Sequence, residues 1–295
     1  MESGRARMTI AQLIQITLVA SIFLMVFSFG LDAGWDDAMW LFRRPGLFAR
    51  SILSMNVLMV LFAITMLTIF DVPRAIRIAL VALALSPVPP IFPKQMSKSG
   101  GTSSYAIGLV VAVSLCAVVL IPCWLLLLGN HYGFEPDLGL RKIAPSIFIS
   151  ILIPLFLGIT INKFAPAFAA RAVKRVSVVA TVLLVAGVIP IFFTAAPAMW
   201  AELGNGVIWV LLSFAVVGII VGHLLGGPNP DDRYVLALAT SARHPGIALA
   251  IAGLNFPEYR KAVMAVILYH LLVGMIVAIP YTKWRAKQQA KLVGG

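Results

Sequence analysis

Residues 233–254 read RYVLALATSARHPGIALAIAGL. The stretch has the length and apolar content of a membrane-spanning helix, yet Arg243, His244, Pro245 and Gly246 lie at its middle. Proline removes a backbone donor and blocks helix continuation, so the pattern predicts a helix that breaks near mid-membrane. Backbone groups freed at that depth are tolerated only where protein or water satisfies them. The sequence therefore predicts an all-α membrane protein with an interrupted helix inside it.

A similar stretch occurs earlier in the chain. Residues 83–90 read LALSPVPP and align with LATSARHP at residues 238–245, an offset of 155, sharing Leu, Ala, Ser and Pro. A second match, at an offset of 121, relates PGLFAR at residues 45–50 to PAFAAR at residues 166–171. These matches predict two repeats. An odd number of spans in each repeat gives the repeats opposite topology, as in many secondary transporters.

The composition excludes a water-soluble domain. The 295 residues are 61% hydrophobic and 12% charged, whereas soluble chains contain about a quarter charged residues. The net charge of +12 does not favour a nucleic-acid partner, because basic residues of membrane proteins gather in cytoplasmic loops. Cys116 and Cys123 lie seven residues apart in one apolar run, which favours packing over a disulfide or a metal site. The expected partner is the lipid bilayer.

Apolar runs bounded by charged residues, Pro or Gly predict ten spans. Residues 75–93 contain four prolines and are split between two short helices, the second of them broken. The two five-helix repeats are predicted at residues 1–142 and 143–295. The ten spans are expected at residues 10–31, 47–70, 74–86, 88–99, 103–128, 143–162, 176–196, 206–226, 233–254 and 259–282.

The distribution of basic residues predicts the orientation. With ten spans both termini lie on one side, and that side collects 14 Lys and Arg residues against 7 on the other. The positive-inside rule then places both termini in the cytoplasm. Lys94 and Arg243 belong to neither side, because both fall inside the expected broken helices. The length and the lack of a targeting peptide are typical of a multi-pass protein of a bacterial inner membrane.

Three features together resemble the bile acid:sodium symporter family. They are the proline-rich break near residues 87–93, the sequence SARHPGIALA at residues 241–250, and the helix entry RRPGLFARS at residues 43–51. The resemblance implies a panel domain of spans 1, 2, 6 and 7 and a core domain of spans 3–5 and 8–10. It also implies that broken spans 4 and 9 cross near mid-membrane behind a substrate cavity. Family members carry organic anions such as bile acids, other carboxylates or sulfonates, usually with sodium.

The chain departs from the family pattern where the family binds sodium. The sodium-binding Glu of that pattern falls on Ala239, and its Gln-Asn pair falls on Arg243 and His244. No acidic residue remains inside either break. Metal cations need oxygen ligands, and a guanidinium beside one adds a repulsion that is large where the dielectric is low. We therefore expect altered or absent sodium coupling, no metal site and no cofactor.

Arg243 is the main candidate for the functional site. An Arg inside a membrane costs about 2.5–3.5 kcal/mol on insertion scales, so a function is the default expectation. It either replaces the sodium charge, binds the substrate anion bidentately, or satisfies the carbonyls of the half-helices. Lys94 is either functional or snorkels from the end of its helix. His244 either couples protons in place of sodium or caps the broken helix.

Several further residues are candidates for the lining of the same site. Hydroxyl and amide side chains in the two breaks and in the second span either face the cavity, bond their own backbone or pack between helices. Prolines in the breaks enforce the interruption. The candidates are Ser86, Thr240, Ser241, Gln95 and Asn56, with Pro90 and Pro245.

The motifs of other function classes are missing. There is no Gly-rich nucleotide loop ending in Lys-Ser or Lys-Thr, and neither H-E-x-x-H nor G-x-S-x-G occurs. The sequence thus favours a secondary active transporter of a small organic anion working by alternating access, and not an enzyme. The alternative is a membrane sensor or scaffold that has kept the transporter fold and lost transport.

Overall fold

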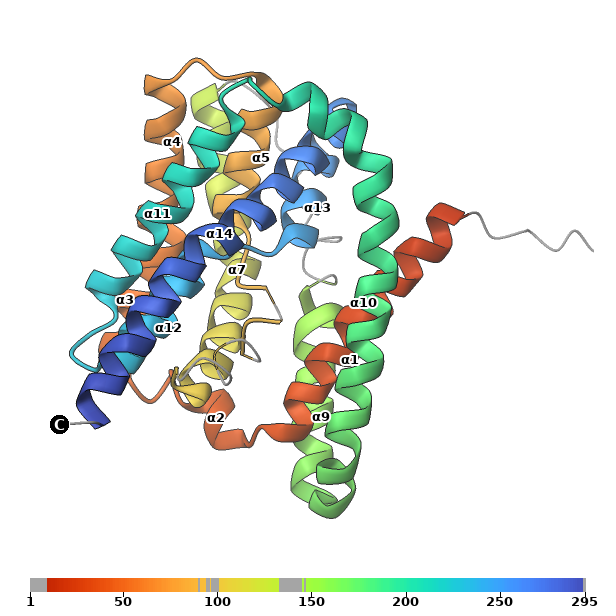
Figure 1. Cartoon of the computed structure of the whole chain (residues 1–295), viewed down its shortest axis with the longest axis vertical. Helices are drawn as coiled ribbons and strands as arrows, with labels where there is room; N and C mark the ends of the chain where they lie inside the picture. Colours follow the sequence, from red (N-terminus) through yellow and green to blue (C-terminus); the bar gives the residue numbers. More distant parts are fainter. Residues whose placement is uncertain are drawn as a thin grey trace, which may run out of the picture.

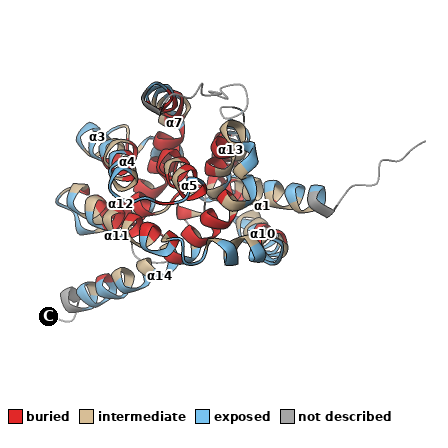
Figure 2. Cartoon of the chain, turned by 90° about the horizontal axis from the view of Figure 1, so that it is seen from above, coloured by how far each residue is buried: buried red, intermediate tan, exposed pale blue. Residues whose placement is uncertain are grey.

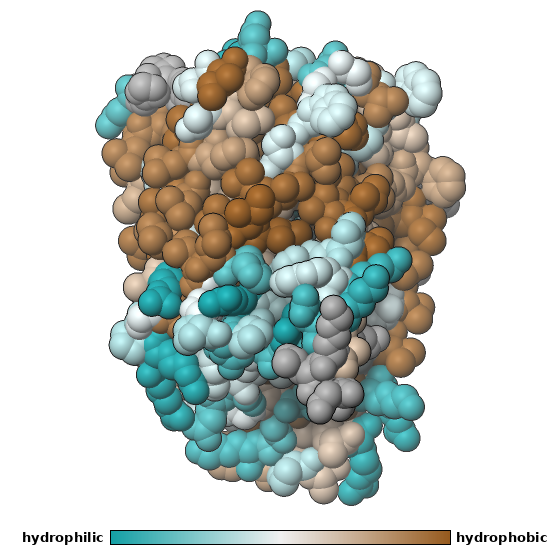
Figure 3. All heavy atoms as spheres, turned by 60° about the vertical axis from the view of Figure 1, so that its left-hand side comes forward, coloured by the Kyte–Doolittle hydropathy of each residue, from teal (hydrophilic) through white to brown (hydrophobic). Residues whose placement is uncertain are grey.

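The structure, a computed structural model, describes residues 10–89, 91–93, 96, 101–132, 145 and 147–293. Every regular element within these residues is a helix. Seven stretches among them are long and apolar enough to span a membrane, and Phe148–Phe164 is a shorter apolar helix. Figure 3 shows a broad apolar surface on one face, with hydrophilic side chains gathered at its lower end. The all-α, polytopic class is therefore confirmed.

The helices form two groups (Figure 1). In one group α1 packs against α9 and α10, and in the other α5, α11, α13 and α14 pack around one core. The bounds are α1 (Ile10–Asp32), α2 (Trp35–Met39), α3 (Pro45–Ile52), η1 (Leu53–Leu58), α4 (Met59–Ile69), α5 (Arg74–Leu85), α7 (Ser103–Tyr132), η2 (Phe148–Leu152), α9 (Ile153–Phe164), α10 (Pro166–Glu202), α11 (Val207–Leu225), α12 (Pro230–Ser241), α13 (Pro245–Asn255), η3 (Pro257–Tyr259) and α14 (Arg260–Val293).

The smaller group is held by close backbone contact. A Cβ atom added to Gly158 of α9 would lie 2.5 Å from the carbonyl oxygen of Phe27 and 2.7 Å from the Cα of Gly30 in α1. Small residues allow membrane helices to approach this closely. Asn162 then fixes the ends of the two helices, because its Nδ2 donates to the carbonyl of Ala33. This group corresponds to three of the four spans expected in the panel domain.

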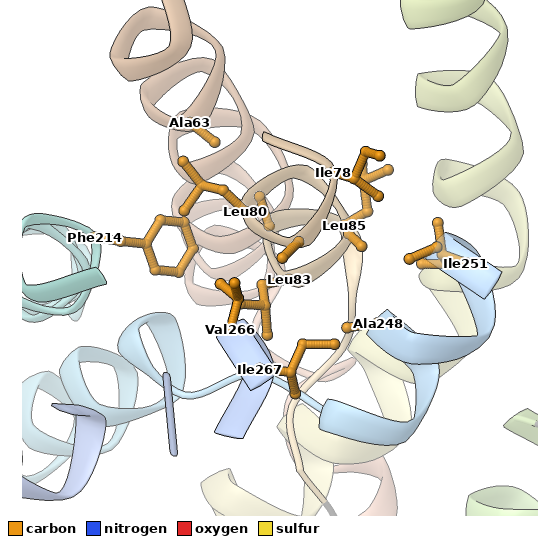
Figure 4. Packing of buried hydrophobic residues seen from close by; sticks show 14 of the residues in the cluster. Ala63, Ile78, Leu80, Leu83, Leu85, Phe214, Ala248, Ile251, Val266 and Ile267 are labelled. Carbon is orange, nitrogen blue, oxygen red and sulfur yellow. The ribbon is translucent and has the colours of Figure 1, made fainter. Parts of the chain in front are cut away.

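The larger group buries the interrupted helix. In the most apolar 18-residue stretch of residues 230–255, 72% of the residues are buried, against 11% in the corresponding stretch of α10. Figure 2 shows this contrast, with buried segments of α5 and α13 in the interior and exposed residues on α10. Leu80 and Leu83 of α5 lie near Phe214 of α11 and Ile267 of α14 (Figure 4). Among the candidate membrane spans, the interrupted helix is therefore the most buried.

Residues 45–69 belong to this larger group, although the second span was expected in the panel domain. Met59, Val60 and Ala63 are buried in the same hydrophobic core as α5 and α11. The helix α3–η1–α4 contacts α5, α7 and α11. It therefore packs with the helices expected in the core domain.

The expected count of ten spans is not confirmed. α5 has 12 residues, or about 18 Å at 1.5 Å per residue, which is too short for a hydrocarbon core of about 30 Å. It starts beside the end of α13, where the Arg74 guanidinium lies 5.9 Å from the Phe256 ring. Thr102, just before α7, donates to Asp232 at the start of α12. Within the described residues, α5 is therefore too short to cross the membrane by itself, so a separate crossing at residues 74–86 is not supported.

The two repeat matches have different outcomes. The match at offset 155 relates the ends of α5 and α12, after which the backbone of Ser86 and of Ala242 is extended. The match at offset 121 relates α3 to α10. From α3 the chain runs through α4 directly to α5, whereas the whole of α11 lies between α10 and α12. This match does not fit a repeat that aligns α5 with α12. Its likeness has a local cause, because Pro45 and Pro166 both occupy the first turn of a helix, where proline is favoured.

Candidate functional site

The two helix breaks meet inside the larger group. The backbone nitrogen of His244 donates to the carbonyl oxygen of Pro87 at 2.8 Å, which joins the break after α5 to the break between α12 and α13. We expected residues 86–95 to lie beside residues 240–246. Within the described residues, hydrogen bonds join Ser86 and Pro87 to Arg243 and His244. Pro90, Lys94 and Gln95 lie outside the described residues, and their predicted roles stay predictions.

Arg243 lies at the centre of this crossover with 1% of its surface exposed. Its Nη1 donates to the carbonyl oxygen of Ser86 at 3.2 Å, and its Nη2 donates to the carbonyl oxygen of Met55 at 3.0 Å. The guanidinium carbon lies 5.7 Å from the centre of the Phe214 ring. One side chain therefore connects the break after α5 with η1 and α11.

Both carbonyls are available because regular helix stops or changes beside them. Ser86 follows the last turn of α5, where helix carbonyls have no partner further along the helix. Met55 lies in η1, a π-helical stretch of Leu53–Leu58 that interrupts the α-helical hydrogen-bond ladder between α3 and α4. Such π-bulges occur frequently at functional sites. The local backbone thus prepares two acceptors for the guanidinium.

The charge of Arg243 has no carboxylate partner among the described residues. The three ion pairs found there are Arg43–Asp36, Arg77–Asp71 and Arg285–Asp231, all near the ends of helices. A guanidinium stays protonated in proteins. The carboxyl ends of α5 and α12 both point toward the crossover and carry partial negative charge. Carbonyl dipoles therefore stabilise this cation in place of a carboxylate.

His244 caps the start of α13. Its Nδ1 accepts from the backbone nitrogen of Ile247 at 3.3 Å, and Pro245 occupies the first helical turn. The His244 Nε2 is buried and has no hydrogen-bond partner among the described residues. The geometry thus provides the capping role that was one of the two alternatives, while proton coupling stays a prediction.

The hydroxyl groups of the predicted site fall into two kinds. Ser86 and Ser241 donate to the carbonyls of Leu83 and Leu238, three residues earlier in their own helices. Thr240 instead pairs with Ser54 of η1 at 2.7 Å, and both residues are fully buried. Of these three candidate hydroxyl groups, only that of Thr240 therefore bonds to a side chain of another helix.

Asn56 of η1 and Ala239 of α12 are both buried. The Oδ1 of Asn56, in η1, has no hydrogen-bond partner among the described residues, while its backbone carbonyl accepts from Trp124 Nε1 at 2.9 Å. Ala239 is packed in the hydrophobic core and brings no oxygen ligand in its side chain. In the described part of the chain, no group of three or more His, Cys, Asp or Glu residues could hold a metal ion.

Sequence reasoning did not find several neighbours of Arg243. The Met55 carbonyl, Ser54, Phe214 and His270 were not among the candidate residues. His270 is 2% exposed, and its ring lies 5.8 Å from that of Phe214 in an edge-on arrangement. A backbone acceptor in a π-bulge leaves no signal in hydropathy. The polar pair Ser54 and Asn56 in an apolar helix was the available clue.

Comparison with known protein families shows which family the chain belongs to. Residues 19–201, more than half of its length, match the Sodium Bile acid symporter family. The chain belongs to this family. Family members are membrane transporters and not enzymes, as the sequence predicted. A search of curated proteins found no match. The matched part of this symporter-family chain includes α5 and its break, whereas α12 and α13 lie beyond it.

Proposed function

We propose that the chain is a secondary active transporter of a small organic anion in which Arg243 takes the place of sodium at the helix crossover. Family membership supports transport, and the buried guanidinium supports the altered coupling. The single observation that carries the proposal is that Arg243 binds the carbonyls of Ser86 and Met55 without a carboxylate partner among the described residues. A carboxylate, a sulfonate or a bile-acid-like anion is the expected substrate.

The electrostatic argument is that two cations do not share this position. A sodium ion about 6 Å from the guanidinium is repelled by about 3 kcal/mol at an effective dielectric constant of about 20. Two carbonyl oxygens that would otherwise coordinate a cation already accept from Arg243. The family's acidic ligand position holds Ala239, whose side chain offers no oxygen. Each of these features opposes sodium binding at the crossover.

A fixed cation has a consequence for the driving force. Arg243 cannot be released with the substrate, so it holds the crossover together without storing energy from an ion gradient. The driving force then comes from another ion, from exchange of anions, or from the gradient of the substrate itself. A proton carried by His244 is the first alternative ion to test.

We also revise the proposed topology to nine crossings. Of the described basic residues outside the crossover, four lie at the end of the molecule where α5 and α14 begin, namely Arg74, Arg77, Arg260 and Lys261. Twelve lie at the opposite end: Arg43, Arg44, Arg50, Lys163, Arg171, Lys174, Arg175, Arg233, Lys283, Arg285, Lys287 and Lys291. The positive-inside rule then favours a cytoplasmic C-terminus and places the start of α1 on the outer side of an inner membrane.

The repeat proposal changes accordingly. The boundary between the two repeats stays between α7 and α9, close to the predicted residues 142 and 143. The first repeat then has four crossings and the second has five. α5 starts at the outer end and α12 at the cytoplasmic end, and this antiparallel relation supports an inverted repeat.

Uptake into proteoliposomes tests the transport proposal. Purified protein is reconstituted in choline buffer, and radiolabelled taurocholate, benzoate and an alkyl sulfonate are offered outside, with protein-free liposomes as the control. The proposal expects accumulation of at least one anion above the control without sodium. If ligands raise the unfolding temperature of the protein while none accumulates with or without sodium, the sensor or scaffold alternative replaces the proposal.

A further inference from the structure

A cavity of about 330 Å³ lies in the larger helix group, at the end where α5 begins and α13 ends. Its lining comes from α4, α5, α7, α13 and the residue that follows α13, and includes Leu67, Arg74, Val81, Ile251 and Asn255. Neither Arg243 nor any residue of α1, α9 or α10 lines it. The described residues that line the cavity therefore all belong to the larger helix group, and Arg243 of the crossover is not among them. Its volume is in the range of small-molecule sites.

One of the two arginines that line the cavity carries an unneutralised charge. The charge of Arg77 is neutralised by Asp71, to which its Nη2 donates at 2.6 Å, and its Nε donates to the carbonyl oxygen of Val72 at 2.8 Å. Arg74 contacts no carboxylate among the described residues, and its guanidinium lies 5.9 and 5.5 Å from the rings of Phe256 and Tyr259. The rings hold this cation at the cavity without neutralising it.

A buried acceptor adds a second polar feature. Asn255 Nδ2 donates to the carbonyl oxygen of Ile251 at 3.0 Å, and this bond fixes which end of the amide is which. Asn255 Oδ1 is then buried without a hydrogen-bond partner among the described residues. Buried polar atoms are nearly always hydrogen-bonded, and Asn255 lines the cavity, so a turn of its amide toward the cavity would let this oxygen accept from a ligand donor.

The remaining lining is mostly aliphatic. Ile78 of α5 and Ile251 of α13 lie on either side of the space between these helices (Figure 4), and Leu67 and Val81 extend the same surface. Among the described residues, the lining offers an apolar wall, a cation without a carboxylate partner and an acceptor without a hydrogen bond, and such a site matches a compact ligand with three parts. These are an apolar body, an anionic group and a hydroxyl donor.

We propose that this cavity binds a compact hydroxycarboxylate, with its carboxylate at Arg74, its hydroxyl at Asn255 and its apolar body against α5 and α13. The Arg77–Asp71 pair is neutral and leaves Arg74 to select for the anion. This binding site goes beyond the proposed transport function and does not depend on it, because its lining excludes Arg243.

Equilibrium binding of radiolabelled mandelate to the purified full chain in nanodiscs tests the site. Three competitors each remove one part of the ligand: phenylacetate lacks the hydroxyl, 1-phenyl-1,2-ethanediol lacks the charge, and lactate lacks the apolar ring. Each is expected to bind about tenfold more weakly than mandelate, equivalent to about 1.4 kcal/mol. Equal affinity for mandelate and the uncharged diol, or no mandelate binding, would overturn the proposal.

Variants assign the binding to the cavity. Arg74→Gln is expected to weaken mandelate binding about tenfold, whereas Arg260→Gln, at the same end of the molecule but outside the cavity, leaves it unchanged. Asn255→Leu is expected to abolish the preference for mandelate over phenylacetate. Val81→Phe fills the cavity and should remove binding, with Leu67→Phe as the substitute if that variant does not fold. Wild-type affinity in both Arg74→Gln and the filled variant would contradict the site.

Mandelate binding also separates this proposal from transport. A chain that binds mandelate through Arg74 but accumulates no anion supports the cavity and contradicts the transporter. A chain that accumulates an anion but binds mandelate equally well after Arg74→Gln supports the transporter and contradicts the cavity.

Discussion

Replacing Arg243 by alanine removes the cation that joins the two helix breaks. The variant leaves the carbonyl oxygens of Ser86 and Met55, now 3.2 and 3.0 Å from the guanidinium nitrogens, without their donor. An unsatisfied buried acceptor costs about 1–3 kcal/mol, so the two together cost about 2–6 kcal/mol. Removal of a buried charge returns part of this free energy. We expect a net loss of about 2 kcal/mol, or roughly 4–8 °C in unfolding temperature.

The more informative effect is a gain of sodium dependence. The vacated position keeps the two carbonyl oxygens and the negative ends of α5 and α12, which favour a cation. If sodium binds there with a dissociation constant of about 10 mM, about 100 mM sodium stabilises the variant by about 1.4 kcal/mol. The wild type should gain nothing, because its own guanidinium occupies the position.

Thermal unfolding in nanodiscs measures both effects. The wild type, Arg243→Ala and the control Arg260→Ala are heated in sodium chloride and in choline chloride at equal ionic strength. Arg260 is exposed at a helix start, so its variant should behave as the wild type in both salts. The reasoning is refuted if Arg243→Ala is as stable as the wild type, or if sodium stabilises the two proteins equally.

Three further predictions concern the architecture. In a double-mutant cycle, Thr240→Val and Ser54→Ala should be non-additive in unfolding free energy by about 0.5–1.5 kcal/mol, and strict additivity would show that their 2.7 Å contact contributes nothing. Gly158→Leu should destabilise the chain by about 1–3 kcal/mol because its Cβ would lie 2.5 Å from the Phe27 carbonyl, whereas Gly253→Ala, with nothing within 4 Å, should not destabilise it. A reporter active only in the periplasm should be silent when fused to the C-terminus and active when fused to the N-terminus; equal signals at both ends would contradict nine crossings.

The parts of the fold that depend on local sequence were predictable. The apolar runs identified the membrane class, and the polar and helix-breaking residues Arg243 to Gly246 identified the break between α12 and α13. Proline alone would not have been enough, since Pro190 and Pro280 lie inside the continuous helices α10 and α14. The number of crossings was not predictable in the same way. A span broken by four prolines has the hydropathy of two short helices, and the proposal of a single crossing rests on the packing of α5 against α13, which hydropathy does not reveal.

The candidate site was likewise predictable from the sequence only in part. The resemblance aligns Ala239 and Arg243 with the family's sodium positions, so the sequence alone predicts the loss of an acidic ligand. The contacts of Arg243 could not be predicted in this way, since the Met55 carbonyl and the Phe214 ring reach it through tertiary packing of η1 and α11. A π-bulge depends on backbone geometry that residue type does not specify.

The central claim is that the wild type works without sodium, and a sodium titration of anion binding tests it most directly. Affinity for a transported anion is measured on purified wild type and Arg243→Gln from zero to high sodium, with choline keeping the ionic strength constant. The account predicts an affinity of the wild type that does not change with sodium, and weaker binding or lower stability in Arg243→Gln. An affinity of the wild type that rises steeply with sodium would contradict the replacement of sodium by Arg243.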